Sequence, residues 1–222
     1  MKHANVSVFV PHAGCPHQCS FCDQRAISGA QAAPDGAAVA ALCARAEKEL
    51  AQKGRTAQIA FFGGSFTAVP RAYMIELLEA ARPFLGRGVF TGVRISTRPD
   101  CIDDETLDTL ARYGVTAVEL GAQSMDDTVL SKNGRGHTAA DTNRASALVR
   151  AHGLELGLQM MTGLYGANGA SDLMSARLIA ALMPATVRVY PTLVLEGTRL
   201  AALWRAGLYR PQTHQELSLI HI

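Results

Sequence analysis

The sequence predicts an α/β fold in which six parallel strands curl into an open, partial (β/α)6 barrel. Short apolar strands alternate with amphipathic helical stretches at intervals of roughly 25 to 40 residues, which is the pattern of repeated βα units. Six such units can be recognised, two fewer than a closed eight-stranded barrel requires. The 222 residues are 48% hydrophobic and 18% charged, so one domain with a sizeable core is expected.

The strand candidates are β-branched or apolar, and each is followed by glycine, proline or polar residues, as buried parallel strands usually are. They span residues 6–10, 58–62, 92–97, 117–121, 154–160 and 186–193. In a fold of this type the C-terminal ends of the strands carry the chemistry.

The first helix is predicted after Asp35, a candidate N-cap, because apolar side chains recur there at spacings of three and four. These are Val39, Leu42, Cys43, Ala46 and Leu50, and Cys43 is expected to be a small buried hydrophobe. Further helices are predicted over residues 71–84, 103–113, 139–152, 171–183 and 198–206. Asp103 and Ser171 are candidate N-caps, and Gly114, Gly153 and Gly207 are candidate stops.

Charge and hydropathy exclude some functional classes. The net charge of +2, from 21 basic and 19 acidic side chains, does not indicate a nucleic-acid or membrane surface. No apolar run approaches the roughly 20 residues that span a bilayer, and the N-terminus lacks the apolar core of a secretory signal. We therefore expect a cytoplasmic protein without a membrane partner.

The last six residues, 217–222, resemble a translation of the transposon end used in preparing sequencing libraries. We therefore expect residues 1–216 to form one core domain, truncated at its C-terminus, and residues 217–222 to be a non-native tail. The alternative is an ordinary apolar tail.

Three of the five cysteines crowd into eight residues, directly after the first strand. Cys15, Cys19 and Cys22 form a C-x3-C-x2-C array, which fits metal or redox chemistry better than a disulfide framework. Three thiolates can bind three irons of a 4Fe-4S cluster and leave the fourth iron without a protein ligand. The alternative is a structural zinc site, for which His12 or His17 would supply the fourth ligand.

A second motif, Gly63-Gly64-Ser65, follows the second strand. Two glycines at this place let a ligand approach the backbone without meeting a side chain. A Gly-Gly pair alone is weak, since most such pairs only turn the chain, but its position after the cysteine-bearing unit makes it specific.

With these motifs and four more, the sequence resembles the radical S-adenosylmethionine (SAM) superfamily. It is most similar there to the radical domain of the Elongator catalytic subunit and its short bacterial relatives that lack the acetyltransferase domain. The further motifs are STRPD at 96–100, VELGAQS at 118–124, GRGHT at 134–138 and VRVYPTLV at 187–194. The resemblance implies the barrel of the radical SAM type.

The resemblance also implies the cofactors and their ligands. Cys15, Cys19 and Cys22 would bind a 4Fe-4S cluster whose open iron chelates SAM, and an electron donor such as a flavodoxin or ferredoxin would trigger its cleavage to a 5′-deoxyadenosyl radical. The positions matched to cofactor contacts are Gly63, Gly64 and Ser65 at the methionyl amino group, Phe21 at the adenine, Gln123 and Arg135 at the methionyl end, and Ser96 and Gln159 near the ribose. Phe21 could equally be a core aromatic. At Ser96 and Gln159 a better-characterised relative has acidic residues.

By the same resemblance the favoured substrate is a tRNA base. The acetyltransferase half is absent, so acetyl-CoA chemistry is not assigned to this chain. Two alternatives come from other classes: a structural zinc-binding module, and a non-catalytic iron-sulfur scaffold that binds RNA.

Several other residues near the strand ends carry weaker expectations. Four arginines lie on or near strand ends, Arg94, Arg98, Arg135 and Arg188, and such a ring could bind RNA phosphates. Solvated helix faces and cofactor binding would explain most of them equally well. His137 and Thr138 are expected to cap the following helix, and Asp126 and Asp127 to begin another. Cys101 and Tyr190 could face the site, although a loop cysteine and a packing tyrosine are the simpler interpretations.

Overall fold

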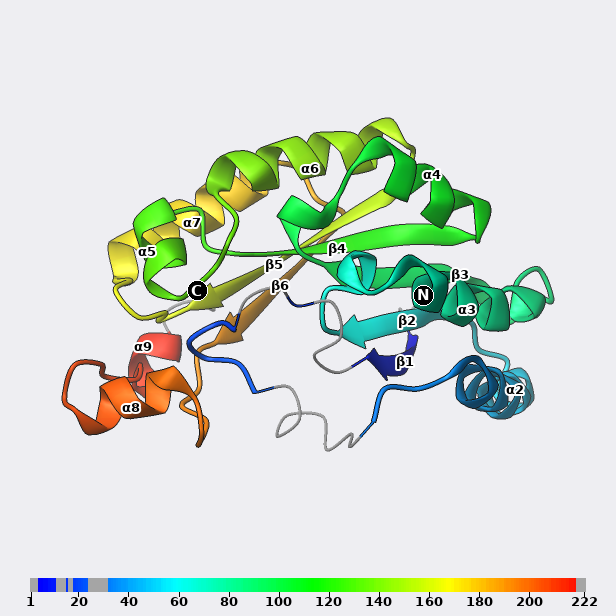
Figure 1. Ribbon diagram of the computed structural model, residues 1–222, viewed down its shortest axis with the longest axis horizontal. Helices are drawn as coiled ribbons and strands as arrows, with labels where there is room; N and C mark the ends of the chain where they lie inside the picture. Colours follow the sequence, from blue (N-terminus) through cyan, green and yellow to red (C-terminus); the bar gives the residue numbers. More distant parts are fainter. Residues whose placement is uncertain (1–3, 11–14, 16–17, 24–31, 219–222) are drawn as a thin grey trace.

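The structure is a computed structural model that describes residues 4–10, 15, 18–23 and 32–218. Six parallel strands form one sheet in sequential order, with β1 and β6 at its edges. The strands are β1 (Asn5–Val10), β2 (Ala57–Gly63), β3 (Phe90–Thr97), β4 (Val115–Gln123), β5 (Glu155–Thr162) and β6 (Thr186–Pro191). The sheet is curved but not closed (Figure 1), so the predicted six-stranded open barrel is confirmed.

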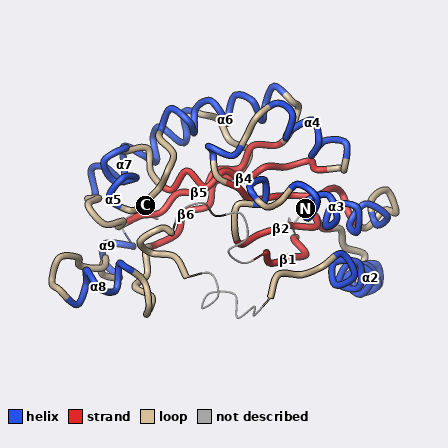
Figure 2. The backbone as a smooth tube through the Cα atoms, in the orientation of Figure 1, coloured by secondary structure: helices blue, strands red, loops and turns tan. Residues whose placement is uncertain are grey.

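The helices between consecutive strands lie on the outer, convex side of this sheet, and the helices after β6 lie beside the end of that strand (Figure 2). They are α2 (Gly36–Gln52), α3 (Arg71–Ala81), α4 (Asp104–Arg112), α5 (Asp127–Lys132), α6 (Ala139–Ala151), α7 (Gly169–Ala181), α8 (Arg199–Arg205) and α9 (His214–Ser218). Short 3-10 helices add Phe66–Ala68, Arg82–Phe84 and Pro99–Cys101. The described part of the tail, Leu217 and Ser218, ends α9, and residues 219–222 lie outside the described ranges.

Most of the helix boundaries follow the predicted signals. Asp35 and Asp103 cap α2 and α4 through hydrogen bonds accepted from the backbone N–H groups of Ala38 and Thr106, and Asp126 caps α5. The predicted stops, Gly114, Gly153 and Gly207, all have the left-handed conformation just after a helix.

The prediction of Ser171 as the cap of α7 is wrong. Asn168 is the N-cap, and its side chain accepts from the N–H of Ser171. The Ser171 side chain in turn bonds to the backbone N–H of Asn168 and completes a capping box, so a second cap-forming side chain sits three residues inside the helix.

The two faces of the sheet differ in chemistry. The convex face and the helices bury an apolar core that includes Ile59, Phe61, Leu78, Val118 and Leu158, and Cys43 of α2 is fully buried in it as expected. Side chains alternate along each strand, so Arg94, Ser96, Glu119 and Gln159 lie on the opposite, concave face. That polar face forms the interior of the open barrel. No helix in the described ranges has the length and apolar character needed to cross a bilayer.

Candidate functional site

A cavity of about 670 Å³ lies at the C-terminal ends of the strands. Every residue that the sequence predicted for the site lines it: Cys15, Cys19, Phe21, Cys22, Gly63, Gly64, Ser65, Ser96, Gln123, Arg135 and Gln159. The lining is completed by Gln18, Asp23, Thr97, Arg98 and Gly121. The roles of the individual residues toward a cofactor remain predictions, but their convergence from six separate segments is a property of the fold.

The cysteine segment is anchored to a distant loop. The backbone N–H of Ser20 donates to the carbonyl of Asn133 over 3.0 Å, and the Ser20 hydroxyl donates to Asn133 Oδ1 over 2.7 Å. Both residues are buried. Sequence reasoning missed this pair, because neither residue carries a local signal for a contact 113 positions apart.

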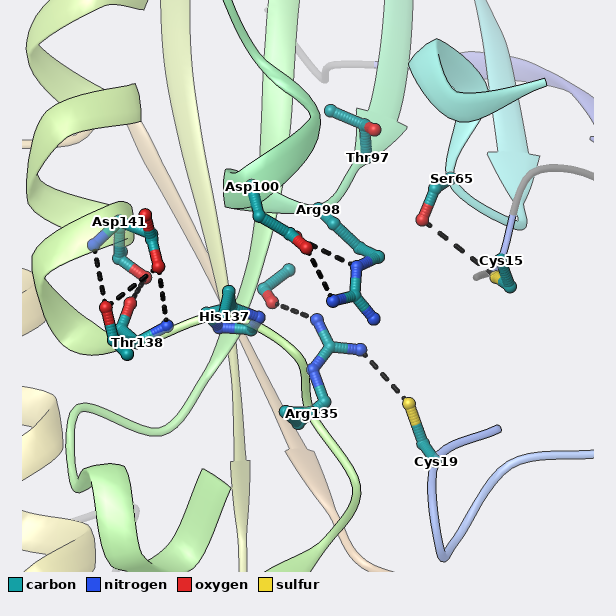
Figure 3. A network of polar contacts seen from close by, with 12 residues as sticks. Cys15, Cys19, Ser65, Thr97, Arg98, Asp100, Arg135, His137, Thr138 and Asp141 are labelled. Atoms are coloured by element: carbon teal, nitrogen blue, oxygen red, sulfur yellow. Dashed lines mark hydrogen bonds and ion pairs between the residues drawn. The ribbon is translucent and has the colours of Figure 1, made fainter. Parts of the chain in front are cut away.

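The three thiols line one cavity, and two of them affect the pKa of the third. Burial, together with the neighbouring Cys19 and Cys15, raises the pKa of Cys22 to about 12. Arg135 acts in the opposite direction, and its Nη1 donates to Cys19 Sγ over 3.3 Å (Figure 3). A metal would displace the thiol protons and bind the thiolates.

Within the described ranges, no three histidine, cysteine, aspartate or glutamate side chains lie close enough together to enclose a single ion. A 4Fe-4S cluster does not need such convergence, because each thiolate binds a different iron. His12 and His17, the candidate zinc ligands, lie outside the described residues. The cysteine donor set therefore fits a cluster.

The side chains of Gln123, at the end of β4, and of Arg135, which reaches this strand end from the loop after α5, have unpaired atoms beside the cavity. Gln123 takes a left-handed backbone conformation, φ +63°, where the β4–β5 register shifts, and its buried Oε1 has no partner among the described residues. Arg135 donates through Nη2 to the carbonyl of Gly121 over 2.6 Å, while its buried Nε has no such partner. Buried polar atoms are normally paired, so these two atoms are available to hydrogen-bond with a ligand in the cavity.

The glycine turn after β2 brings its backbone to the cavity, as predicted. Gly63 has φ +116°, and a Cβ there would lie 2.7 Å from the carbonyl oxygen of Val10. The N–H of Gly64 donates to that same oxygen over 2.9 Å. Ser65 follows as a buried residue whose Oγ lies 3.9 Å from Cys15 Sγ, so the turn contacts the first predicted cluster ligand.

Ser96 and Gln159 lie together at the inner side of the cavity. Gln159 Nε2 donates to Ser96 Oγ over 3.4 Å and to Glu119 Oε2 over 2.8 Å. Glu119 is 1% exposed, and the sequence analysis did not select it. The signal was present, since a glutamate inside an apolar strand is rarely buried unless it is paired.

The hypothesis of an arginine ring for RNA phosphates is wrong for three of its members. Arg94 is 1% exposed and pairs with Glu119 and Glu155, and Arg188 also pairs with Glu119. Arg98 forms a two-pronged ion pair with Asp100. Carboxylates thus already pair with these guanidinium groups: Glu119 and Glu155 on other strands for Arg94 and Arg188, and Asp100, two residues along the chain, for Arg98.

The expectation of a helix cap at residues 137 and 138 is confirmed only for Thr138, which forms a capping box with Asp141. His137 is buried, and its Nε2 bonds to the carbonyl of Ala122 over 3.0 Å. Burial and the adjacent Arg135 lower the pKa of His137 to about 4. His137 is therefore neutral, and its hydrogen bond to Ala122 links the loop after α5 to the end of β4.

Cys101 and Tyr190 contribute nothing to the lining of this cavity. Cys101 ends the 3-10 helix after β3, where its carbonyl accepts from the Thr67 hydroxyl. Tyr190 is 41% exposed at the edge strand β6.

Comparison with known proteins gives a consistent result. The model of the Radical SAM superfamily matches residues 9–179. A "tRNA uridine(34) acetyltransferase" of Dehalococcoides mccartyi (strain CBDB1) is 28% identical over 93% of this chain and 52% of its own length. "Elongator complex protein 3" of Schizosaccharomyces pombe is 30% identical over 70% of this chain and 32% of its own length.

Among solved structures, the archaeal Methanocaldococcus infernus Elp3 superimposes with a TM-score of 0.73 at 23% identity, covering 96% of this chain and 51% of that one. This likeness shows the shared fold. The chain thus spans about half the length of the Dehalococcoides and Methanocaldococcus relatives and about a third of the Schizosaccharomyces one. The family model matches most of the chain, and the cavity brings its three cysteines together. The chain therefore belongs to the radical SAM superfamily.

Proposed function

We propose that the chain is a radical SAM enzyme in which Cys15, Cys19 and Cys22 bind a 4Fe-4S cluster and the adjoining cavity binds SAM. When bound, the cluster would supply the electron for reductive cleavage of SAM to methionine and a 5′-deoxyadenosyl radical. The observation that carries this proposal is the convergence of the three thiols, the glycine turn and two unpaired polar side chains on one cavity.

The chain's own residues bind and orient the cofactor in this proposal. The guanidinium of Arg135 suits the methionyl carboxylate, because it is cationic and its Nε has no partner among the described residues. Gln123 Oε1 is an acceptor of the kind that a ligand amino group requires. Gly63 and Gly64 keep side chains away from the methionyl end, and Phe21 borders the adenine.

The proposed substrate is a tRNA base. Support comes from relatives that are named tRNA uridine(34) acetyltransferase and from the match to Elongator complex protein 3. We further propose that residues 1–216 act as the radical-generating core, in the cytoplasm, with a flavodoxin or ferredoxin as electron donor.

The first test is made on protein purified and reconstituted without oxygen. We expect about four irons per chain, a reducible cluster in electron paramagnetic resonance, and conversion of SAM to methionine and 5′-deoxyadenosine after reduction. Each of Cys15→Ala, Cys19→Ala and Cys22→Ala should abolish both the cluster and the product. Cys101→Ala, which removes a nearby thiol outside the cavity, should retain them.

Two results would count against this function. One zinc per chain and no iron would support the structural zinc module. A full cluster without any 5′-deoxyadenosine over several hours would support the non-catalytic scaffold. The substrate is tested separately by mass spectrometry of tRNA nucleosides from cells with and without the gene, where an unchanged profile removes tRNA but not the radical chemistry.

A further inference from the structure

A buried ionic network lies on the concave face of the sheet, beside the inner side of the cavity. Its centre is the carboxylate of Glu119 on β4. Glu119 Oε1 accepts from Arg94 Nη1 over 3.2 Å and from Arg188 Nη2 over 2.9 Å, while Oε2 accepts from Gln159 Nε2 over 2.8 Å. Of these partners, only Gln159 also lines the cavity.

The fold holds the carboxylate of Glu119 in one place. Arg94 is itself fixed by Gln58, which accepts from its Nε over 2.8 Å, and by Glu155 at 2.5 Å. The guanidinium of Arg188 lies 5.0 Å from the centre of the Phe62 ring. Arg94 on β3 and Arg188 on β6 thus both form ion pairs with the Glu119 carboxylate.

A glycine on the next strand makes room for this arrangement. A Cβ at Gly157, which pairs with Glu119 in the β4–β5 register, would lie 2.8 Å from Glu119 Cγ. Any larger residue would displace the glutamate side chain. The absence of a side chain at Gly157 therefore leaves the space that the Glu119 side chain occupies.

The chemistry of the pair decides which way the Gln159 amide faces. A carboxylate without a proton only accepts hydrogen bonds, so Glu119 selects the NH2 end of the amide. The neighbouring Ser96 Oγ accepts from that same nitrogen. The amide oxygen of Gln159 is then turned away from Glu119 and left to accept a hydrogen bond from another group.

We propose that Glu119 is a positioning residue that turns the Gln159 amide so that its oxygen accepts a hydrogen bond from a donor group of SAM. This inference rests on the proposed function, since it needs SAM in the cavity. Arg94 and Arg188 hold Glu119, Glu119 orients Gln159, and Gln159 contacts the cofactor. Glu119 itself does not line the cavity.

The test is SAM affinity, measured by equilibrium dialysis on cluster-loaded variants of matched iron content. Glu119→Gln lets the Gln159 amide flip, and we expect about tenfold weaker binding, as for loss of a hydrogen bond to a charged group. Gln159→Glu places two carboxylates face to face and should bind more weakly still. The double variant Glu119→Gln with Gln159→Glu again places a hydrogen-bond donor, the amide at position 119, beside an acceptor, the carboxylate at position 159. It should bind SAM at least about threefold more tightly than Gln159→Glu alone.

Two controls keep the test decisive. Glu105→Gln removes the carboxylate of an exposed ion pair with Arg71, outside both the Glu119 network and the cavity lining, and its SAM affinity should stay within about twofold of the parent protein. Gln159→Met leaves the ion pairs of Glu119 intact, so it reports on the amide even if Glu119→Gln does not fold, and it should also weaken binding.

The outcomes separate this inference from the function beneath it. Unchanged affinity in a folded Glu119→Gln, or a swap no better than Gln159→Glu, overturns the positioning role. Unchanged affinity in Gln159→Met removes the contact to the cofactor. If the parent protein neither binds nor cleaves SAM, the proposed function itself has failed.

Discussion

Arg135 Nη1 donates a hydrogen bond to Cys19 Sγ over 3.3 Å, which joins the loop after α5 to the cysteine segment. The same guanidinium donates to the carbonyl of Gly121 at the end of β4. Since Asn133 also holds Ser20, two residues of one loop fix two consecutive residues of the cysteine segment. The geometry of the proposed cluster site therefore depends on the segment 133–135 as well as on the cysteines.

The several hydrogen-bond donors of the Arg135 guanidinium should contribute more to SAM binding than its positive charge does. Arg135→Lys keeps a cation but cannot span Gly121, Cys19 and a ligand at once, so we expect about tenfold weaker SAM binding with the cluster retained. Arg144→Lys is the matched control, because Arg144 is an exposed partner of Asp141 on α6. Equal SAM affinity in the two variants, measured by dialysis, would contradict the role given to Arg135.

The anchor between Ser20 and Asn133 gives a second prediction. Asn133 is fully buried, and its Nδ2 also donates to the carbonyls of Val129 and Tyr165. Asn133→Ala leaves several buried groups unpaired and should lower the free energy of unfolding by about 3 kcal/mol. Ser20→Ala removes only one of these bonds and should cost about 1 kcal/mol.

Urea unfolding measures both variants of this anchor, and limited proteolysis reports on the cysteine segment. We expect cleavage near residues 18–23 to become faster in Ser20→Ala than in the parent protein. An unchanged cleavage rate would mean that the contact to Asn133 does not hold the segment.

The sequence predicted the six strands and most helices because their signals are local. Blocks such as 58–62 are apolar enough to be buried on both faces, and caps such as Asp103 act within three residues of their partner. The cavity lining could be predicted because the motifs follow strand ends, which a parallel sheet brings to one edge.

Other features depend on pairings that no local pattern contains. Glu119 becomes the centre of an ionic network only because β3, β5 and β6 bring Arg94, Gln159 and Arg188 to it. The arginine ring failed for the same reason at Arg94 and Arg188, since the carboxylates that pair with them lie on other strands. Asn168 rather than Ser171 caps α7, and because both residue types form good caps, residue type alone does not decide between them.

The turn at Gly63 yields a third prediction. Gly63→Ala places a Cβ 2.7 Å from the Val10 carbonyl oxygen in a left-handed conformation, so both a clash and backbone strain oppose it. Gly54 also has a positive φ, +58°, but a Cβ there would meet nothing within 4 Å, so Gly54→Ala is the control for a positive φ without a clash. We expect Gly54→Ala to cost about 1 kcal/mol and Gly63→Ala clearly more, with loss of SAM binding. Thermal unfolding and dialysis check this, and equal costs would show that the Val10 contact relaxes freely.

The last prediction concerns pH and His137. Burial and Arg135 lower the pKa of this imidazole from 6.5 to about 4, so the unfolded chain takes up its proton at a higher pH than the folded one. The stabilisation from the neutral form is complete above pH 6.5 and is lost as the pH falls from there to about 4. The loss amounts to at most about 3 kcal/mol. His137→Gln can still donate to the Ala122 carbonyl but does not titrate, so its free energy of unfolding should fall less steeply across this window. Urea unfolding at a series of pH values gives both slopes, and parallel curves would show that His137 is not held neutral by its surroundings.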